Sequence, residues 1–286
     1  MKTIKTLFLL TALTLLLVLG GKAIGGERGM TIGLILAVVM NGVSYFFSDK
    51  IALRSSGAQP VTREQAPRLY AVMERLAGKA GLPMPKLYVS PQPAPNAFAT
   101  GRNPHHAAVC VTAGLMQIMN DDELEGVIAH ELSHVRNYDI LTSSIAATLA
   151  GAITWVAEMG RWGLIFGGFG GGSRDSEGEG NAITAILMLI LAPLAALLLQ
   201  LGISRQREYQ ADASGVKMVG HPYGLISALQ KLEGYNKKIP MQISQSTAAL
   251  CIVAPLQARQ MFANLFSTHP PLDDRIAILK QMQITR

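Results

Sequence analysis

The stretch HELSHVRNYDILTSSIAATLAGAITWV, residues 130–156, joins two kinds of sequence that have opposite solvent requirements. Its first five residues have the H-E-x-x-H spacing of helical zinc sites, which work on water. The seventeen residues from Ile140 onward are almost all apolar, as in a helix that enters a membrane. The sequence therefore predicts a hydrolytic metal site directly beside a lipid-embedded segment.

The composition is that of a chain partly solvated by lipid. Hydrophobic residues make up 49% of the 286 residues and charged residues only 15%, whereas about a quarter are charged in soluble domains. The net charge of +6 is carried by lysines and arginines that flank apolar runs instead of forming one basic stripe. This distribution argues against nucleic acid as a partner and favours membrane anchoring. Cys110 and Cys251 could form one disulfide, but two free buried thiols in a reducing compartment are the preferred interpretation.

Four apolar runs occupy residues 7–19, 30–47, 140–157 and 182–201. Because a helix of about 20 mostly apolar residues crosses a bilayer, all four are predicted to be transmembrane helices. The first run could instead belong to a signal peptide, but no A-x-A cleavage site follows it, so an uncleaved span is preferred. The third run is the weakest candidate because it carries several hydroxyl side chains.

The flanking charges predict which side of the membrane each polar block occupies. Positive residues lie at the N-terminus, after Lys50 and around Arg205, and with four spans these places share one side. The positive-inside rule makes that side the cytoplasm. The predicted organisation is two membrane helices in 1–48, a cytoplasmic part in 49–139, two membrane helices joined by a Gly-rich loop in 140–201, and a second cytoplasmic part in 202–286.

Capping and turn signals predict the elements of the two cytoplasmic parts. A strand is expected at 85–90 and a β-hairpin at 96–114 that turns near Gly101. Thr62 and Gln65 have capping-box spacing at the start of the first helix, and Asn120 caps the second. Helices are expected at 62–81, 120–137, 203–220, 222–236 and 271–283.

His130 and His134 lie four residues apart, so on a helix they share one face and can both reach one zinc ion at about 2 Å. Glu131 lies beside the first of them and can act as general base on a metal-bound water, whose pKa zinc lowers to near 7. A chance match is the plain alternative. The apolar flanks of the motif and the acidic first turn after Asn120 favour a real metal helix.

A catalytic zinc ion usually has three protein ligands and one open position. A third histidine about ten residues after His130 is ruled out, because Ile140 already begins an apolar run. Glu208 and Asp212 are four apart, so Glu208 could be the third ligand while Asp212 orients a ligating imidazole. An exposed acidic pair on a solvated helix face is the alternative, and spacing alone does not decide between them.

Four motifs and their order give the chain a resemblance to the HtpX family of membrane zinc peptidases, relatives of the CAAX prenyl proteases. The motifs are NAFATG at 96–101, HELSH at 130–134, REYQAD at 207–212 and STHPPLDDRI at 267–276. The resemblance, which also rests on the four apolar runs, covers essentially the whole chain. The expected fold is that of an α+β membrane protein, with four transmembrane helices and a mainly helical, zincin-like cytoplasmic catalytic domain that holds a small β-sheet.

The resemblance implies a role for each site residue. One Zn²⁺ per chain would be held by His130, His134 and Glu208, with Glu131 as catalytic base. Asp212 would pair with Arg275 behind the ligands. His269 would stabilise the oxyanion of the tetrahedral intermediate, although the sequence around it would otherwise indicate an ordinary loop histidine. Asn96, Ala97, Phe98 and Ala99 would form an edge strand that binds extended substrates by β-augmentation.

The family also implies a biological role. By this resemblance, the chain is expected to be a multi-pass endopeptidase of the bacterial cytoplasmic (inner) membrane, with its catalytic domain on the cytoplasmic side. Such an enzyme would cut unfolded or misfolded membrane proteins in envelope quality control. The expected partners are these substrates and the lipid bilayer, with no nucleic acid. A non-catalytic zinc-dependent membrane scaffold or chaperone is the main alternative. A metal transporter is disfavoured because the apolar runs hold almost no ionisable residues.

Overall fold

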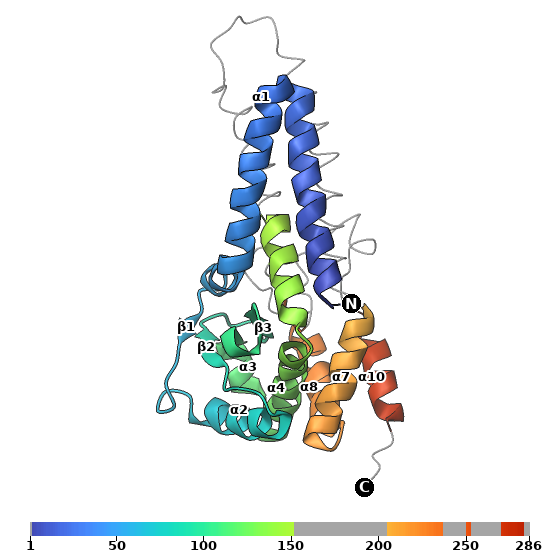
Figure 1. Cartoon of the computed structure of the whole chain (residues 1–286). Coiled ribbons are helices and arrows are strands. Elements are labelled where there is room, and N and C mark those ends of the chain that lie inside the picture. Colours follow the sequence, from blue (N-terminus) through green and yellow to red (C-terminus); the bar gives the residue numbers. More distant parts are fainter. Residues whose placement is uncertain (1, 152–204, 237–249, 253–269, 283–286) are drawn as a thin grey trace, which may run out of the picture.

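The computed structural model describes residues 2–151, 205–236, 250–252 and 270–282. The fourth apolar run, the Gly-rich loop and His269 lie outside these residues, and so do the predictions made for them. The described chain places a small sheet and a group of helices below a long helical hairpin (Figure 1). Cys110 and Cys251 are both buried and free, as predicted.

The hairpin is formed by α1 (Lys2–Ser55), which contains the first two apolar runs and turns back on itself near Gly26, where φ is 61°. The Asn41 side-chain amide donates to the Leu10 carbonyl at 3.3 Å and to the Thr14 hydroxyl at 2.9 Å. In a straight helix, 31 residues would span about 46 Å. The two arms of α1 therefore lie antiparallel and side by side (Figure 1).

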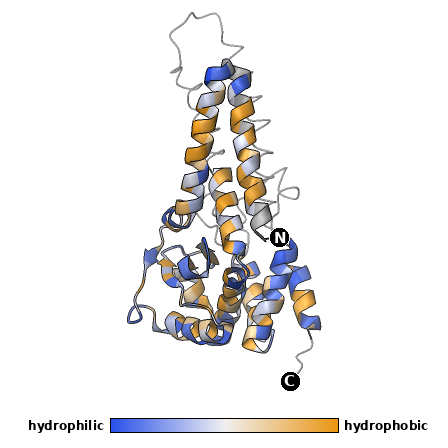
Figure 2. Ribbon diagram, in the orientation of Figure 1, coloured by the Kyte–Doolittle hydropathy of each residue, from blue (hydrophilic) through white to orange (hydrophobic). Residues whose placement is uncertain are grey.

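The two arms of the hairpin consist mostly of hydrophobic residues (Figure 2), and many of their large apolar side chains are exposed. The second arm, Gly26–Ser55, contains an 18-residue window with a mean hydropathy of 1.8, and it is the one helix in the described residues that is long and apolar enough to cross a membrane. Thr6–Leu19 is a shorter apolar helix in the first arm. The structure thus supports membrane association, while the number of four spans stays a prediction. Large exposed apolar side chains on α1 include Leu7, Phe8, Leu15, Leu19, Ile32, Ile35, Val38, Val39 and Phe46.

The third apolar run is helical from residue 139 to residue 151, the last residue described there. Its apolar side chains pack against Leu9 and Leu13 of α1. Its hydroxyl groups, which weakened the prediction of a span, have partners: Thr142 bonds Thr6 at 2.9 Å and Ser144 bonds Thr100 at 2.8 Å. Satisfied hydroxyls cost little to bury, so the run packs between protein elements instead of facing lipid all round.

The sheet has four strands in the order β1-β2-β4-β3: β1 (Gln59–Pro60), β2 (Lys86–Ser90), β3 (Ala97–Gly101) and β4 (Ala107–Thr112). The predicted strand and hairpin are confirmed. β3 pairs with β4 antiparallel, with a 3₁₀ turn at Pro104–His106 between them, and β2 pairs with β4 in parallel. β3 is therefore an edge strand among the described residues.

The predicted helices are present with one difference in where they start, and α3 (Ala113–Ile118) forms where no helix was predicted. α2 (Pro67–Ala80) begins five residues after the predicted Thr62, because Pro67 takes the first helical turn, where its missing N–H is harmless. The capping-box pair forms a local turn instead, in which the Thr62 N–H donates to Gln65 Oε1 at 2.9 Å. The helix ends at Gly81 in the left-handed conformation, as predicted.

α4 (Asp121–Arg136) is the central helix of the polar region, and Asn120 and Glu123 form a complete capping box at its start. Val127, Ile128 and Leu132 are wholly buried in the main core. At Gly126 the backbone of α8 comes so close that a Cβ would lie 2.5 Å from Leu225 N. The remaining helices are α3 (Ala113–Ile118), α7 (Arg205–Val219), α8 (Tyr223–Asn236) and α10 (Leu272–Gln281).

Candidate metal centre

His130 and His134 project from one face of α4, and their imidazoles meet edge to face with the two Nε2 atoms 3.2 Å apart. Two nitrogen ligands at about 2 Å from one tetrahedral ion would be separated by about 3.3 Å. The spacing of the two rings therefore fits a shared metal ion. It follows from the helix alone, because residues four apart in sequence lie one above the other.

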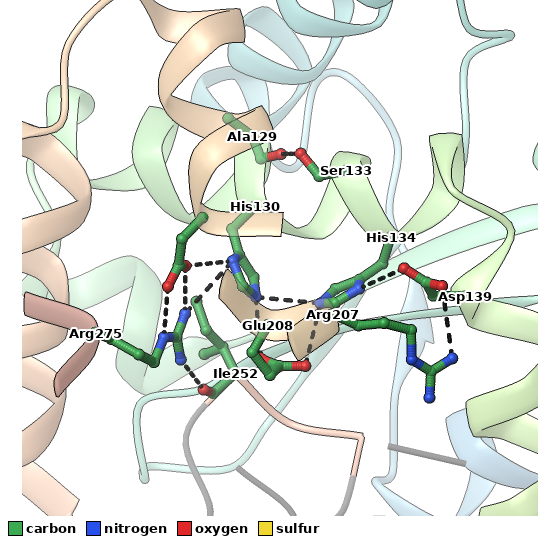
Figure 3. Close-up of polar contacts among 10 residues, drawn as sticks. Ala129, His130, Ser133, His134, Asp139, Arg207, Glu208, Ile252 and Arg275 are labelled. Atoms are coloured by element: carbon green, nitrogen blue, oxygen red, sulfur yellow. Dashed lines mark hydrogen bonds and ion pairs between the residues drawn. The ribbon is translucent and has the colours of Figure 1, made fainter. Parts of the chain in front are cut away.

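Glu208 on α7 completes the group. Its two carboxylate oxygens lie 3.6 Å from His130 Nε2 and 3.6 Å from His134 Nε2. One ligand atom from each of the three residues lies within 4.8 Å of the others, and Figure 3 shows Glu208 facing both rings. Glu208 and Asp212 are only 4% and 1% exposed, so the interpretation as a solvated acidic pair is wrong.

Asp212 and Arg275 lie behind His130. The Asp212 carboxylate accepts from His130 Nδ1 at 2.8 Å, which leaves Nε2 directed at the centre of the group. Arg275 grips the same carboxylate through Nε at 2.9 Å and Nη2 at 2.7 Å. Burial alone would raise the pKa of Asp212, but the charge of Arg275 and these hydrogen bonds lower it to about 2. The carboxylate is therefore ionised at neutral pH.

Two imidazoles and one carboxylate around a shared centre form the ligand set of many hydrolytic zinc enzymes. Residues 63–283 match the model of peptidase family M48. The chain belongs to that family. Over 276 residues it is 55% identical to a protein named Protease HtpX homolog from Desulfatibacillum aliphaticivorans, with 96% of this chain and 88% of that one covered. A protein of the same name from Desulforapulum autotrophicum is 52% identical over 277 residues, which cover 97% of this chain and 89% of the relative.

Among solved structures, the crystal structure of S. mikatae Ste24p is similar to this chain, with a TM-score of 0.52 and 22% sequence identity. The match covers 97% of this chain and 65% of the Ste24p chain. At that identity the match supports the fold. The family and the relatives together make the chain a membrane-bound metalloprotease, and the ligand geometry accounts for the metal it requires. The alternative of a non-catalytic scaffold loses its support at this point.

Glu131, the second residue of the H-E-x-x-H motif, lies in the cavity that the three candidate ligands border, and it is 2% exposed. Burial raises the pKa of its carboxyl group, while the two histidines oppose the shift. A carboxylate with a raised pKa beside a metal is suited to take a proton from water and to deliver it later.

Asp139 and Arg207 form a second carboxylate–arginine pair, which lies behind His134 as Asp212 and Arg275 lie behind His130. This pair was not predicted from the sequence. Asp139 Oδ2 lies 3.5 Å from His134 Nδ1, and Asp139 Oδ1 lies 3.5 Å from Arg207 Nη1 (Figure 3). The available signal was a lone acidic residue at the start of an apolar run, where a charge has to find a partner.

The remaining predicted residues divide between the cavity and the sheet. Asn96 lies just before β3, and Ala97, Phe98 and Ala99 lie in it, but only Ala99 borders the metal cavity. Ile252 joins the cavity from a distant part of the chain, and its N–H donates to the Ala97 carbonyl at 2.9 Å. The cavity is lined by Ala99, His130, Glu131, His134, Asp139, Ile140, Ser143, Glu208, Leu250, Cys251 and Ile252.

Proposed function

We propose that the chain is a zinc endopeptidase of the bacterial cytoplasmic membrane that cuts unfolded or misfolded membrane proteins on the cytoplasmic side. The observation that carries the proposal is the arrangement of His130, His134 and Glu208 around one point, with Glu131 in the same cavity. Two imidazoles and one carboxylate suit zinc, and they leave a position for water or substrate.

The chemistry follows from the side chains around that point. A bound zinc ion would polarise the scissile carbonyl and lower the pKa of a water molecule. Glu131 would accept a proton from the attacking water and later deliver a proton to the leaving amine. Asp212 keeps His130 in the tautomer that can ligate, and Arg275 keeps Asp212 ionised and in place. His269 is proposed, from its motif alone, as the donor to the oxyanion.

The outer edge of β3 is proposed to bind the substrate backbone. The Thr112 N–H donates to the Asn96 carbonyl at 2.9 Å. The backbone N–H and C=O groups of even-numbered residues in β3 are therefore directed at β4, and those of odd-numbered residues are directed away from the sheet. At Ala97 the N–H donates to Asn96 Oδ1 at 3.0 Å, and the carbonyl accepts from Ile252. The next outward position is Ala99, which borders the metal cavity. An extended substrate that pairs with Ala99 therefore has its carbonyl beside the candidate ligands.

The position of the cavity supports substrates that emerge from the bilayer. Ile140 and Ser143 line it, and they belong to the helix whose next turns pack against α1. In Figure 1 this helix rises from the end of α4 into the space between the two arms of α1. The proposed substrate position at Ala99 and the start of this helix therefore border the same cavity.

The test compares the wild type with Glu131→Gln, purified in detergent, with Glu125→Gln as the control on the same helix. Bound zinc is counted, and cleavage of an unfolded protein such as casein is followed with and without a chelator. One zinc per chain in all three proteins is expected, with chelator-sensitive cleavage lost only in Glu131→Gln. Cleavage by Glu131→Gln at the wild-type rate would refute the mechanism, and absence of zinc from the wild type would refute the metal assignment.

Membrane topology is tested separately with reporters that fluoresce only in the cytoplasm. A fusion in the loop at 166–181 should be dark, and a fusion after Arg286 should be bright. A bright loop fusion would contradict the four-span arrangement, while a dark C-terminal fusion would contradict the cytoplasmic position of the catalytic residues.

A further inference from the structure

Each of the two candidate histidine ligands has a carboxylate and an arginine on its far side. Behind His130 stand Asp212 and Arg275, with contacts of 2.7 to 2.9 Å. Behind His134 stand Asp139 and Arg207, with two contacts of 3.5 Å. The order histidine Nδ1, carboxylate, guanidinium is the same in both, although the residues come from different elements.

The backbone makes a sharp turn to bring Asp139 to His134. In a continuous helix, five residues correspond to about 500° of rotation, so Asp139 would point about 140° away from His134. α4 instead ends at Arg136, and Tyr138 adopts a left-handed conformation with φ of 60°. The next helix then begins at Asp139. A non-glycine residue in this conformation costs about 1 kcal/mol, and such costs are often found at functional sites.

We propose that Asp139, itself held by Arg207, is the positioning residue for His134. The carboxylate accepts the Nδ1 proton, so that the lone pair of Nε2 points toward the metal position that the proposed function assigns. The charge of Arg207 keeps the carboxylate from turning away to solvent. Resting as it does on the proposed ligand role of His134, this inference adds two residues to the metal centre.

The two carboxylate–arginine pairs differ in burial and in contact distance. The Asp139 side chain is 9% exposed and that of Arg207 is 14% exposed, whereas Asp212 and Arg275 are 1% and 0% exposed. The contacts to Asp139 are also longer. Loss of Asp139 should therefore weaken metal binding less than loss of Asp212, because solvent can partly replace it.

Asp139 ties the metal centre to the membrane helix. It is the first residue of the helix at 139–151, whose Ile145 and Leu149 pack against α1. Arg207 lies in the first turn of α7, directly after the segment that contains the fourth apolar run. The orientation of His134 thus depends on elements at both ends of the segment that is predicted to enter the bilayer.

The test measures zinc affinity by competition with a chromophoric chelator, in a Glu131→Gln background that is expected to lack cleavage activity. Asp139→Asn should lower the affinity roughly 10- to 100-fold, the usual effect of removing a hydrogen-bonded partner of a ligand. Asparagine starts a helix as well as aspartate does, so a role in helix capping alone predicts no loss. Asp139→Glu should restore part of the affinity, and Asp122→Asn, an exposed change on α4, should leave it unchanged.

Arg207 is tested by Arg207→Gln against Arg136→Gln, which removes one exposed positive charge near the end of α4. Arg207→Gln should lower zinc affinity and Arg136→Gln should not. If Arg207 acts through Asp139, the double variant should lose no more than Asp139→Asn alone. Wild-type affinity in both Asp139→Asn and Arg207→Gln would overturn the inference. If Asp139→Asn fails to fold, Arg207→Lys is measured in its place, since lysine keeps the charge but changes the geometry of the contact. Reduced zinc affinity of Arg207→Lys would then support the inference, and wild-type affinity would overturn it. Zinc binding lost from every protein, controls included, would instead count against the proposed function.

Discussion

Arg275 of α10 and Asp212 of α7 form a bidentate ion pair that is buried, with side-chain exposures of 0% and 1%. The guanidinium also donates through Nη1 to the Ile252 carbonyl at 2.9 Å. One side chain therefore joins three separate parts of the chain directly behind His130. The energetic importance of such a pair lies in what happens when only one partner is removed, because the other is left charged and buried.

Arg275→Met should destabilise the protein by about 3 to 5 kcal/mol, because the Asp212 carboxylate then lacks its counter-charge. Thermal unfolding in detergent measures the loss. Arg275→Lys should recover only part of it, since an ammonium group cannot make the paired contacts of a guanidinium. Adding Asp212→Asn to Arg275→Met removes the uncompensated charge and should restore some stability. Wild-type unfolding of Arg275→Met would contradict this account.

Glu123 should make the stability depend on pH. It is buried at the start of α4 and accepts from Ser227 Oγ at 2.6 Å and from Lys231 Nζ at 2.7 Å, both on α8. Burial alone would raise its pKa, but these hydrogen bonds outweigh burial and lower the pKa below 4.5. The ionised group therefore adds stability at pH values above 4.5, and that stability is lost as the pH falls through the lowered pKa.

Glu123→Gln tests this pairing, because glutamine can still bond the backbone N–H of Asn120 but carries no charge. At pH 7 it should cost about 1 to 3 kcal/mol, the range for hydrogen bonds to charged groups. The difference from the wild type should shrink as the pH falls through the lowered pKa. A difference that stays constant from pH 7 down to the lowest pH at which both proteins remain folded would show that charge is not the cause.

The contact between α4 and α8 requires a glycine at position 126. A Cβ there would lie 2.5 Å from Leu225 N and 2.8 Å from Leu225 Cα, and backbone atoms cannot move aside as a side chain can. Gly126→Ala should therefore destabilise the protein by about 1 to 3 kcal/mol and displace the metal helix, with reduced zinc affinity.

Gly234 provides the matched control for this change. It lies on α8, and a Cβ at this position would meet no atom within 4 Å, so alanine fits there without strain. Gly234→Ala should be neutral or stabilising by up to about 1 kcal/mol, as alanine favours helices over glycine. Equal effects of the two changes on stability would show that the α4–α8 contact does not require glycine at position 126.

The parts of the site that were predictable are those set by local sequence. The helix capped by Asn120 places His130 and His134 on one face, and the four-residue spacing of Glu208 and Asp212 places them on one face of their helix. The sequence offered no rule for burial, so it could not choose between a ligand and an exposed acidic pair at Glu208. The structure excludes the exposed pair, because the packing of α7 on α4 buries both carboxylates.

The residues that were missed depend on backbone turns or distant contacts. Asp139 reaches His134 only because Tyr138 takes a left-handed conformation, which its residue type does not favour. Ile252 reaches β3 across more than a hundred residues, and no local pattern marks it. At Thr62 two local signals competed, and the one with the stricter backbone requirement, Pro67, set the start of α2.

The two arms of α1 should separate if their glycine contact is filled. Gly33 lies against the backbone of Leu17, so that a Cβ at this position would overlap the Leu17 carbonyl. Close approach at small residues is a main source of helix association in lipid, where no hydrophobic force draws helices together. Gly33→Val should therefore weaken the hairpin by about 1 to 3 kcal/mol. It should also loosen the packing of Leu9 and Leu13 against the helix at 139–151.

Gly42→Val is the control in the same arm, because a Cβ at Gly42 meets nothing within 4 Å. Both variants add the same apolar side chain to the same helix, so they change hydropathy equally and differ only in the contact. Proteolysis and thermal aggregation in detergent micelles measure the result, and only Gly33→Val should become more sensitive. Since the helix at 139–151 also carries Asp139, Gly33→Val should lower zinc affinity as well. Equal behaviour of the two variants would show that the arms are held by something other than their close backbone contact.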